Sequence, residues 1–429
     1  MYLKTKKFKG DDFMKKLIVI LVLILSIVGF SKYQNTAINY LKYLYSNKYD
    51  KAIDMSTEIM KKQLPESKLK QTWETIEKAY GKFQGMEKID FTKNGEYEVY
   101  IITSNFEKTK LSIIISVDKN GKIAGLFFNQ AKNYVYNNPS YVDTSKFNEI
   151  DITLGEKWKL NGKLTVPNRK ETFPAIILVH GSGPNDMDET IGPNKPFKDL
   201  AYGLSSNNIV VLRYDKRTKV YGDKMSKITL NDEVFEDVNY AIKYLSKLYY
   251  VDKIYILGHS LGGYLAPYIA KNNERISGII LMAAPARQLE ELTIEQLEYL
   301  KKFEDAENIK VYDIIIEQLK KTRNNELDNN VNVLGAPVYY YKELREYMPT
   351  KYLPDLNIPI LILQGKRDYQ VTKKDYDILK KYANNSKLYD DLNHLFIKGD
   401  GDPNPYEYYS EGHVDEKVIK DIVEWVKNN

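Results

Sequence analysis

From about residue 147 onward, short apolar runs alternate with segments whose apolar residues recur at helical spacing. The apolar runs span residues 175–179, 209–212, 254–257, 278–282 and 360–363. Between them, apolar residues recur every three or four positions, as in 197–204 and 230–245. Continuous apolar strands between helices are typical of a parallel sheet that is covered on both faces. The pattern therefore predicts an α/β fold over residues 147–429, with a mostly parallel sheet.

A different pattern fills residues 32–132. Apolar residues at helical spacing come first, followed by β-type runs at 97–102, 111–117 and 123–128. Asn94-Gly95 and Asn120-Gly121 are hairpin-turn signals. The pattern predicts a smaller α+β domain, with an antiparallel sheet and helices on one side. It contains no histidine, and nothing in it indicates a ligand.

Two further segments interrupt these patterns. Residues 133–146 contain Asn137-Asn138-Pro139 and are interpreted as a linker. Residues 287–354 break the strand-helix alternation with two or three helical patterns and a cluster of three tyrosines at 339–341. An insertion at this point of an α/β sheet is expected to form a cap over the pocket, although a decorative insertion is the alternative.

The N-terminal segment 1–31 has the features of an export signal. Leu17–Phe30 is apolar apart from Ser26 and Gly29, and it follows Met14-Lys15-Lys16. A spanning helix needs ~20 apolar residues, so this run is short for one. The segment predicts a signal peptide or a membrane anchor, and hence a secreted or membrane-anchored protein outside the cytoplasm.

Charge and cysteine content exclude several classes of protein. The chain has 429 residues, with 63 Lys and Arg against 58 Asp and Glu. Residues 1–35 alone carry seven lysines and two aspartates, so the remainder is formally neutral. A nucleic-acid-binding protein would need a basic folded face. Because the chain contains no cysteine, disulfides, thiolate metal sites and a cysteine nucleophile are excluded, and we expect neither a metal nor a cofactor.

One motif indicates the chemistry. Gly258-His259-Ser260-Leu261-Gly262-Gly263 follows a β-type run and precedes apolar residues at helical spacing. Strand, Gly-x-Ser-x-Gly and helix together form the context of a nucleophile elbow. Ser260 is therefore the candidate nucleophile, and a serine that merely caps the helix is the alternative.

A serine nucleophile needs a histidine base, and the chain contains four histidines. His180 ends a strand, and the side chain of His259 is expected to point away from its neighbour Ser260. His394 lies in a loop after the last strand, whereas His413 stands just before the closing helix. Position favours His394 over His413 as the base.

The base needs a carboxylate, and Asp368 is the candidate because it follows the strand at 360–363 in a turn. The preceding strand ends in Ala283-Ala284-Pro285, without a carboxylate, and Asp390 and Asp391 are expected to shape the turn before the histidine. For the oxyanion, the glycines flanking Ser182 are expected to aim its amide at the same point as the Leu261 amide.

Four motifs together resemble the α/β-hydrolase superfamily, and within it a bacterial serine-esterase branch. They are His180-Gly181-Ser182-Gly183-Pro184, Arg213-Tyr214-Asp215-Lys216-Arg217, the elbow at 258–263, and Leu392-Asn393-His394. That branch often carries a small N-terminal α+β domain. The resemblance implies hydrolysis of carboxylic esters, with Ser260, Asp368 and His394 as the triad and a small-molecule ester as substrate.

Two other interpretations remain open at this point. A peptidase, lactonase or acyltransferase would use the same triad. A surface-binding protein that acts through residues 32–132 would need no catalysis, although every catalytic position holds a competent residue. Membrane association through the N-terminal segment is compatible with all of these interpretations.

Overall fold

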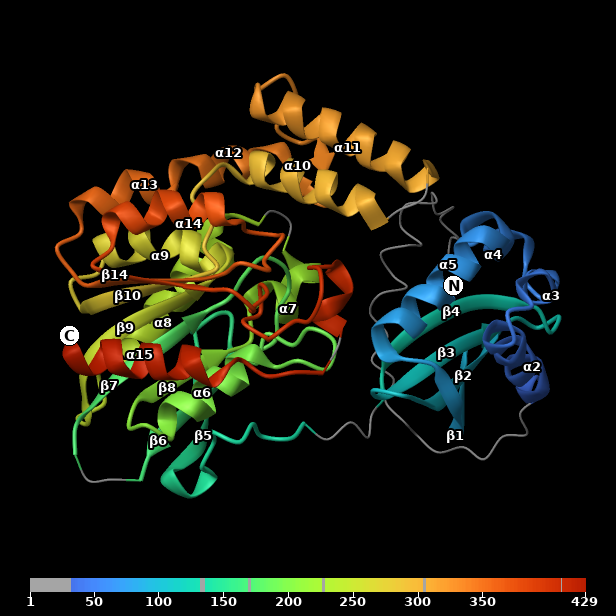
Figure 1. Ribbon diagram of the computed structural model, residues 1–429, viewed down its shortest axis with the longest axis horizontal. Coiled ribbons are helices and arrows are strands. Elements are labelled where there is room, and N and C mark those ends of the chain that lie inside the picture. Colours follow the sequence, from blue (N-terminus) through green and yellow to red (C-terminus); the bar gives the residue numbers. More distant parts are fainter. Residues whose placement is uncertain (1–31, 132–135, 169–170, 226–227, 304–305, 410) are drawn as a thin grey trace, which may run out of the picture. The chain divides into compact units, whose positions relative to one another are not determined.

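The computed structural model describes residues 32–131, 136–168, 171–225, 228–303, 306–409 and 411–429 (Figure 1). The expected export segment 1–31 therefore lies outside the described residues. Among the residues that are described, no helix is both long enough and apolar enough to cross a membrane.

The N-terminal part consists of helices followed by a four-stranded sheet. The helices are α2 (Gln34–Tyr45), α3 (Tyr49–Asp54), α4 (Glu58–Gln63) and α5 (Glu66–Tyr80). The strands are β1 (Phe83–Asn94), β2 (Tyr97–Phe106), β3 (Lys110–Val117) and β4 (Ile123–Gln130), paired in that order. Gly95 and Gly121 have φ angles of 60° and 77°, in agreement with the two predicted turns. Buried Trp73 of α5 lies 6.0 Å from the ring of Phe106 on β2, which joins this helix to the sheet.

The C-terminal part is built on an eight-stranded sheet with the order β14-β13-β10-β9-β7-β8-β6-β5. Six neighbouring strands, from β14 to β8, run parallel, and β6 pairs antiparallel with both β8 and β5. The predicted α/β fold with a mostly parallel sheet is confirmed, and strands β6 and β5 are additional to the prediction. The strands are β5 (Phe147–Leu154), β6 (Leu160–Pro167), β7 (Phe173–Val179), β8 (Val210–Tyr214), β9 (Val251–His259), β10 (Ile276–Met282), β13 (Ile360–Gly365) and β14 (Asn385–Tyr389).

Both faces of this sheet are buried under helices. In β7, Ile177 and Val179 join one apolar cluster, and Ile176 and Leu178 join another on the opposite face. The first cluster contains residues of α8 (Glu236–Leu245) and α9 (Leu261–Lys271), and the second contains residues of α6 (Pro196–Ser205) and α15 (Glu416–Asn428). Strands that are apolar on both faces were the feature that predicted this arrangement. Shorter helices are α7 (Arg217–Tyr221) and α14 (Lys373–Leu379).

Residues between β10 and β13 form a mainly helical insertion (Figure 1). It contains α10 (Leu289–Leu300), α11 (Ala306–Arg323), α12 (Val338–Glu346) and α13 (Pro349–Tyr352), with a two-stranded hairpin of β11 (Asn332–Val333) and β12 (Ala336–Pro337). The insertion has an apolar cluster of its own, which includes Leu297, Leu319 and Tyr341. It is thus a packed unit rather than a long irregular loop.

Candidate active site

Ser260 occupies the tight turn between strand β9 and helix α9. Its φ is 51° and its ψ is −116°, a backbone conformation that residues with a Cβ rarely adopt. The turn is held on both sides, because the Ser260 N–H donates to the Met282 carbonyl (2.9 Å) and its carbonyl accepts from the Tyr264 N–H (3.0 Å). The Ser260 side chain makes no capping hydrogen bond to α9. Helix capping therefore does not explain this serine, and the strained geometry is that of a nucleophile elbow.

Gly262, two residues after Ser260, is required because two backbone segments approach each other closely at this point. A Cβ at Gly262 would lie 2.1 Å from the carbonyl oxygen of Val179, at the end of the neighbouring strand β7. No side chain fits at that distance. The motif thus lets the first turn of α9 lie directly against the carboxyl end of β7, where the loop after that strand begins.

Asp368 and His394 meet although 26 positions separate them in the sequence. The Asp368 Oδ2 lies 2.6 Å from the His394 Nδ1, and both residues are buried. Asp368 follows β13 and His394 follows β14, and these two strands pair in parallel. Their carboxyl ends therefore bring the two loops together. With its Nδ1 facing the carboxylate, His394 keeps its Nε2 for another partner.

The alternatives raised by the sequence lie elsewhere. His413 places its Nδ1 3.1 Å from an oxygen of Asp199, a buried carboxylate on α6, and His413 does not line the cavity around Ser260. The side chain of Asp390 is 80% exposed and pairs with Lys366. Geometry thus separates Asp368 and His394 from the other candidates.

The two candidate oxyanion donors are the N–H of Ser182, in the loop after β7, and the N–H of Leu261, at the start of α9. The N–H of Gly181 donates to the Glu189 Oε1 at 2.6 Å, so that amide is already occupied. Among the described residues, no acceptor is found for the amides of Ser182 or Leu261. Both residues line the same cavity as Ser260. These are the two donors that the sequence predicted.

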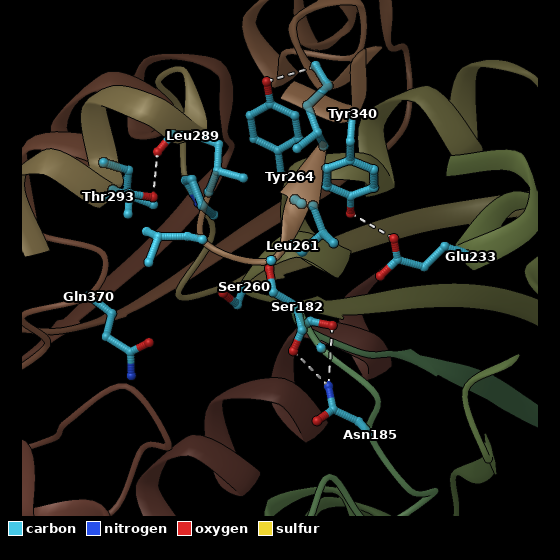
Figure 2. A pocket seen from close by; sticks show the side chains of 18 of the residues that line it. Ser182, Asn185, Glu233, Ser260, Leu261, Tyr264, Leu289, Thr293, Tyr340 and Gln370 are labelled. Atoms are coloured by element: carbon cyan, nitrogen blue, oxygen red, sulfur yellow. Dashed lines mark hydrogen bonds between the residues drawn. The ribbon is translucent and has the colours of Figure 1, made fainter. Parts of the chain in front are cut away.

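A cavity of about 740 Å³ surrounds Ser260 (Figure 2). Its volume is in the range typical of small-molecule sites. The insertion between β10 and β13 supplies much of its wall, including Leu289, Leu292, Leu334 and Tyr340. Aliphatic and aromatic side chains dominate that wall, so an apolar substrate group would be removed from water there.

The charged side chains of this wall are paired. Glu233 accepts from the Tyr340 hydroxyl (2.6 Å) and forms an ion pair with Lys216 (2.6 Å). Lys216 also donates to the Gly181 carbonyl at 2.8 Å. Arg287 is neutralised by three carboxylates, those of Asp375, Glu291 and Glu295. Among the described residues, no group of three or more His, Cys, Asp and Glu is arranged to hold a metal ion.

From the sequence alone, no role was assigned to Glu189, Lys216, Glu233 or His259. The structure places Glu189 and Glu233 at the cavity, and it places the Nε2 of His259 at 2.9 Å from the His394 carbonyl oxygen. The one available signal was the position of His259 beside the nucleophile. The partners of these residues come from distant loops, and no local pattern marks such pairs.

Comparison with known proteins supports this description. Residues 174–400 match a family described as serine aminopeptidase, S33, and residues 37–126 match a family described as a protein of unknown function, DUF3887. A relative named Esterase EstD, from Thermotoga maritima, is 42% identical over 416 residues, which cover 96% of this chain and 99% of EstD.

Solved structures with similar folds include two esterases. Est1E from Butyrivibrio proteoclasticus is 19% identical with a TM-score of 0.45, over 65% of this chain and 99% of Est1E. The Pyrococcus furiosus esterase Pf2001 is 15% identical with a TM-score of 0.43, over 70% of this chain and 99% of that one. From the family match and the relationship to EstD, the chain belongs to the α/β-hydrolase superfamily, in its bacterial serine-esterase branch with a small N-terminal α+β domain.

Proposed function

We propose that the protein hydrolyses carboxylic esters through an acyl-enzyme intermediate on Ser260, with His394 as base and Asp368 as its partner. The observation that carries this assignment is the 2.6 Å contact between Asp368 and His394, beside a serine held in a strained turn. Both Ser260 and His394 line one cavity. The relationship to a protein named as an esterase supports the reaction class.

The reaction has two steps that use the same groups. The His394 Nε2 takes the Ser260 hydroxyl proton as the Oγ attacks the ester carbonyl carbon, and the proton then passes to the departing alcohol as the ester C–O bond breaks. Water next attacks the acyl-enzyme, gives its proton to His394, and releases the acid as Ser260 regains a proton. In both steps the amides of Ser182 and Leu261 would donate to the carbonyl oxygen as it becomes negative.

The cavity favours neutral esters over charged substrates. An aminopeptidase needs a free carboxylate to bind the substrate ammonium group, but Glu189 and Glu233 already face cationic or hydroxyl partners. Arg287 is likewise saturated by carboxylates and offers no site for an acidic substrate. The remaining wall suits an apolar acyl or alcohol group. Esters are therefore the preferred substrates, ahead of peptides.

A panel of nitrophenyl esters of graded acyl length, with a matched nitroanilide and a lactone, tests this proposal on the purified protein. Ester cleavage should exceed amide cleavage, and Ser260→Ala should abolish it together with labelling by a fluorophosphonate. Ser246→Ala, at a serine after α8 and outside the cavity, is the matched control and should leave both unchanged. Full esterase activity in the Ser260→Ala protein would refute the assignment, and absence of labelling in the native protein would favour a non-enzymatic role.

We further propose that the protein acts outside the cytoplasm, delivered or anchored by residues 1–31. The support is the sequence alone, an apolar run of 14 residues after Met14-Lys15-Lys16. Cell fractionation should find the full chain outside the cytoplasm or with the membrane, and a chain starting at residue 32 inside it. Equal cytoplasmic recovery of the two chains would contradict the proposal.

A further inference from the structure

A buried carboxylate joins two of the loops that meet at the active site. Glu189 is 2% exposed and has a φ of 52°, which is strained for a residue with a side chain. Its Oε1 accepts the Gly181 N–H at 2.6 Å. A Cβ at Gly181 would lie 3.2 Å from both this oxygen and the Ser260 Cβ, so the peptide approaches the elbow closely. Glu189 thus fixes the peptide that precedes the candidate oxyanion amide of Ser182.

The other oxygen of this carboxylate faces the residue before the nucleophile. The Glu189 Oε2 lies 2.9 Å from the Nδ1 of His259, as an ion pair rather than an aligned hydrogen bond. The Nε2 of His259 lies 2.9 Å from the carbonyl oxygen of His394 and must donate to it, since a carbonyl only accepts. Two lone pairs would repel at the Nδ1 contact, so one proton lies between the two atoms. With that proton on the Nδ1, His259 is an imidazolium balanced by the Glu189 carboxylate.

The surroundings agree with a charged pair. Burial by itself would lower the pKa of His259, but the charge and contact of Glu189 outweigh it and raise that pKa. Burial favours the neutral acid of Glu189, yet the charge of His259 lowers its pKa. Burial lowers the pKa of His180 to about 4, so its ring adds no positive charge beside the pair. Lys216 is paired with Glu233, and Asp368 faces His394.

We propose that Glu189 and His259 are positioning residues of the esterase. Together they tie three loops: the oxyanion loop through Gly181, the elbow through His259 itself, and the base loop through the backbone of His394. Neither side chain needs to touch the reacting atoms, because each acts through a peptide or side chain that does. The inference rests on the proposed function, because it explains what holds Ser182, Ser260 and His394 in position relative to one another for that reaction.

Removing the carboxylate tests the proposal kinetically. Misplacing a reacting group by about 1 Å costs about 10²-fold in rate, so Glu189→Ala should lower kcat about 10²-fold and change KM less than about threefold. Glu189→Gln keeps an acceptor for Gly181 but loses the charge, and it should fall between the wild type and the alanine variant. The matched control is Asp199→Asn, which alters a buried carboxylate–histidine contact away from the cavity. It should lower the melting temperature and leave kcat unchanged.

These kinetic outcomes separate positioning from folding. A kcat of Glu189→Ala within threefold of the wild type would overturn the proposal, as would an equal loss of kcat in Asp199→Asn. Each kcat is measured well below the melting temperature of its variant. If Glu189→Ala does not fold, the glutamine variant and the spectroscopic measurement below still decide the matter.

The protonation state of His259 gives a test on the unmodified protein. With only four histidines in the chain, nitrogen NMR of ¹⁵N-histidine-labelled protein at pH 8 should show His259 with both ring nitrogens protonated. The signal is assigned by its disappearance in His259→Gln, and the imidazolium form should be lost in Glu189→Gln. A neutral His259 in the wild type would overturn the proposal. The signal should persist in Ser260→Ala, so a failure of this inference is distinguishable from a failure of the proposed esterase activity.

Discussion

The carboxylate of Asp368 is held by four donors, and this arrangement decides what an amide would do in its place. The Oδ1 accepts from the backbone N–H groups of Gln370 (2.8 Å) and Val371 (2.9 Å). The Oδ2 faces the His394 Nδ1 at 2.6 Å and accepts from the Gln364 side-chain amide at 3.2 Å. Each carboxylate oxygen thus faces two nitrogen donors, and these contacts fix the orientation of the Asp368 side chain.

In Asp368→Asn, the amide oxygen must take the position of Oδ1, because two backbone N–H groups point there. The new NH₂ then faces His394 and donates to its Nδ1, which forces the ring proton onto Nε2. An Nε2–H cannot accept the proton of Ser260. A wrong tautomer of this kind costs about 10⁴-fold in kcat, which corresponds to ~5.4 kcal/mol of transition-state stabilisation.

The substitution should affect stability far less than rate. The new NH₂ meets the Gln364 side-chain amide donor to donor, but that amide also donates to the carbonyls of Gly365 (3.1 Å) and Val371 (2.8 Å). The free energy of unfolding should therefore fall by only ~1 kcal/mol. Stopped-flow assays with a nitrophenyl ester measure acylation, and urea denaturation measures stability.

Asp390→Asn is the matched control, since it makes the same change at an exposed carboxylate in the same region. It should keep the wild-type kcat. Near-wild-type acylation by Asp368→Asn would refute the assignment of the acid, and so would a comparable loss in Asp390→Asn.

Two further predictions concern the framework of the site. Gly262→Ala should lose more than ~4 kcal/mol of unfolding free energy in urea denaturation, because its Cβ would meet the Val179 carbonyl at 2.1 Å. Gly222→Ala is the control: its Cβ would have no neighbouring atom within 4 Å, so the unfolding free energy should change by less than ~0.5 kcal/mol. Burial lowers the pKa of His180 to about 4, below the ~6.5 of an unfolded histidine, so the unfolded chain binds the proton first and stability falls as the pH drops from 6.5 to 4. The loss should reach ~3 kcal/mol and should disappear in His180→Gln, and an unchanged pH slope in that variant would contradict the reasoning.

The parallel sheet and the elbow could be predicted because their signals are local. Strands buried on both faces read as continuous apolar runs, as in 175–179 and 254–257. The elbow combines such a run with glycines that only a close backbone approach requires. The order of Ser260, Asp368 and His394 along the chain then followed from the strands that precede them.

Strands β1, β5 and β6 were not predicted, and for β1 and β5 the exposure of their residues explains why. Every residue of β1 is exposed or half-buried, and most of β5 is exposed. Both lie at the edge of their sheets. An edge strand packs fewer side chains than a central one, so its sequence carries a weak periodic signal. The helical insertion between β10 and β13 was anticipated as a segment, although its boundaries stay predictions.

The buried charged pairs at the site could not be predicted from the sequence, for a different reason. Lys216 and Glu233, or Glu189 and His259, are ordinary charged or polar residues in a chain where 28% of residues are charged. Such residues usually lie in water, and only tertiary structure shows that these four are buried. Breaking a buried pair by removing one partner costs several kcal/mol, whereas an apolar replacement of both is often neutral. Stability therefore gives little reason to keep these pairs, and their position around Ser260 indicates that function does.

Backbone strain, like the buried charged pairs, is concentrated around the active site. Among the described residues, eight other than glycine have a positive φ, and three of them are asparagines, which tolerate this conformation. The other five are Glu189, Ser260, Ala283, Leu334 and Phe396. Three of these line the cavity, Ala283 directly follows β10, and Phe396 belongs to the base loop. Each strained residue costs ~1–3 kcal/mol and persists only where its surroundings over-determine it. Leu334 lies in the turn between β11 and β12 of the insertion. The other four follow strands of the main sheet, whose burial on both faces constrains the loops at the carboxyl ends of its strands.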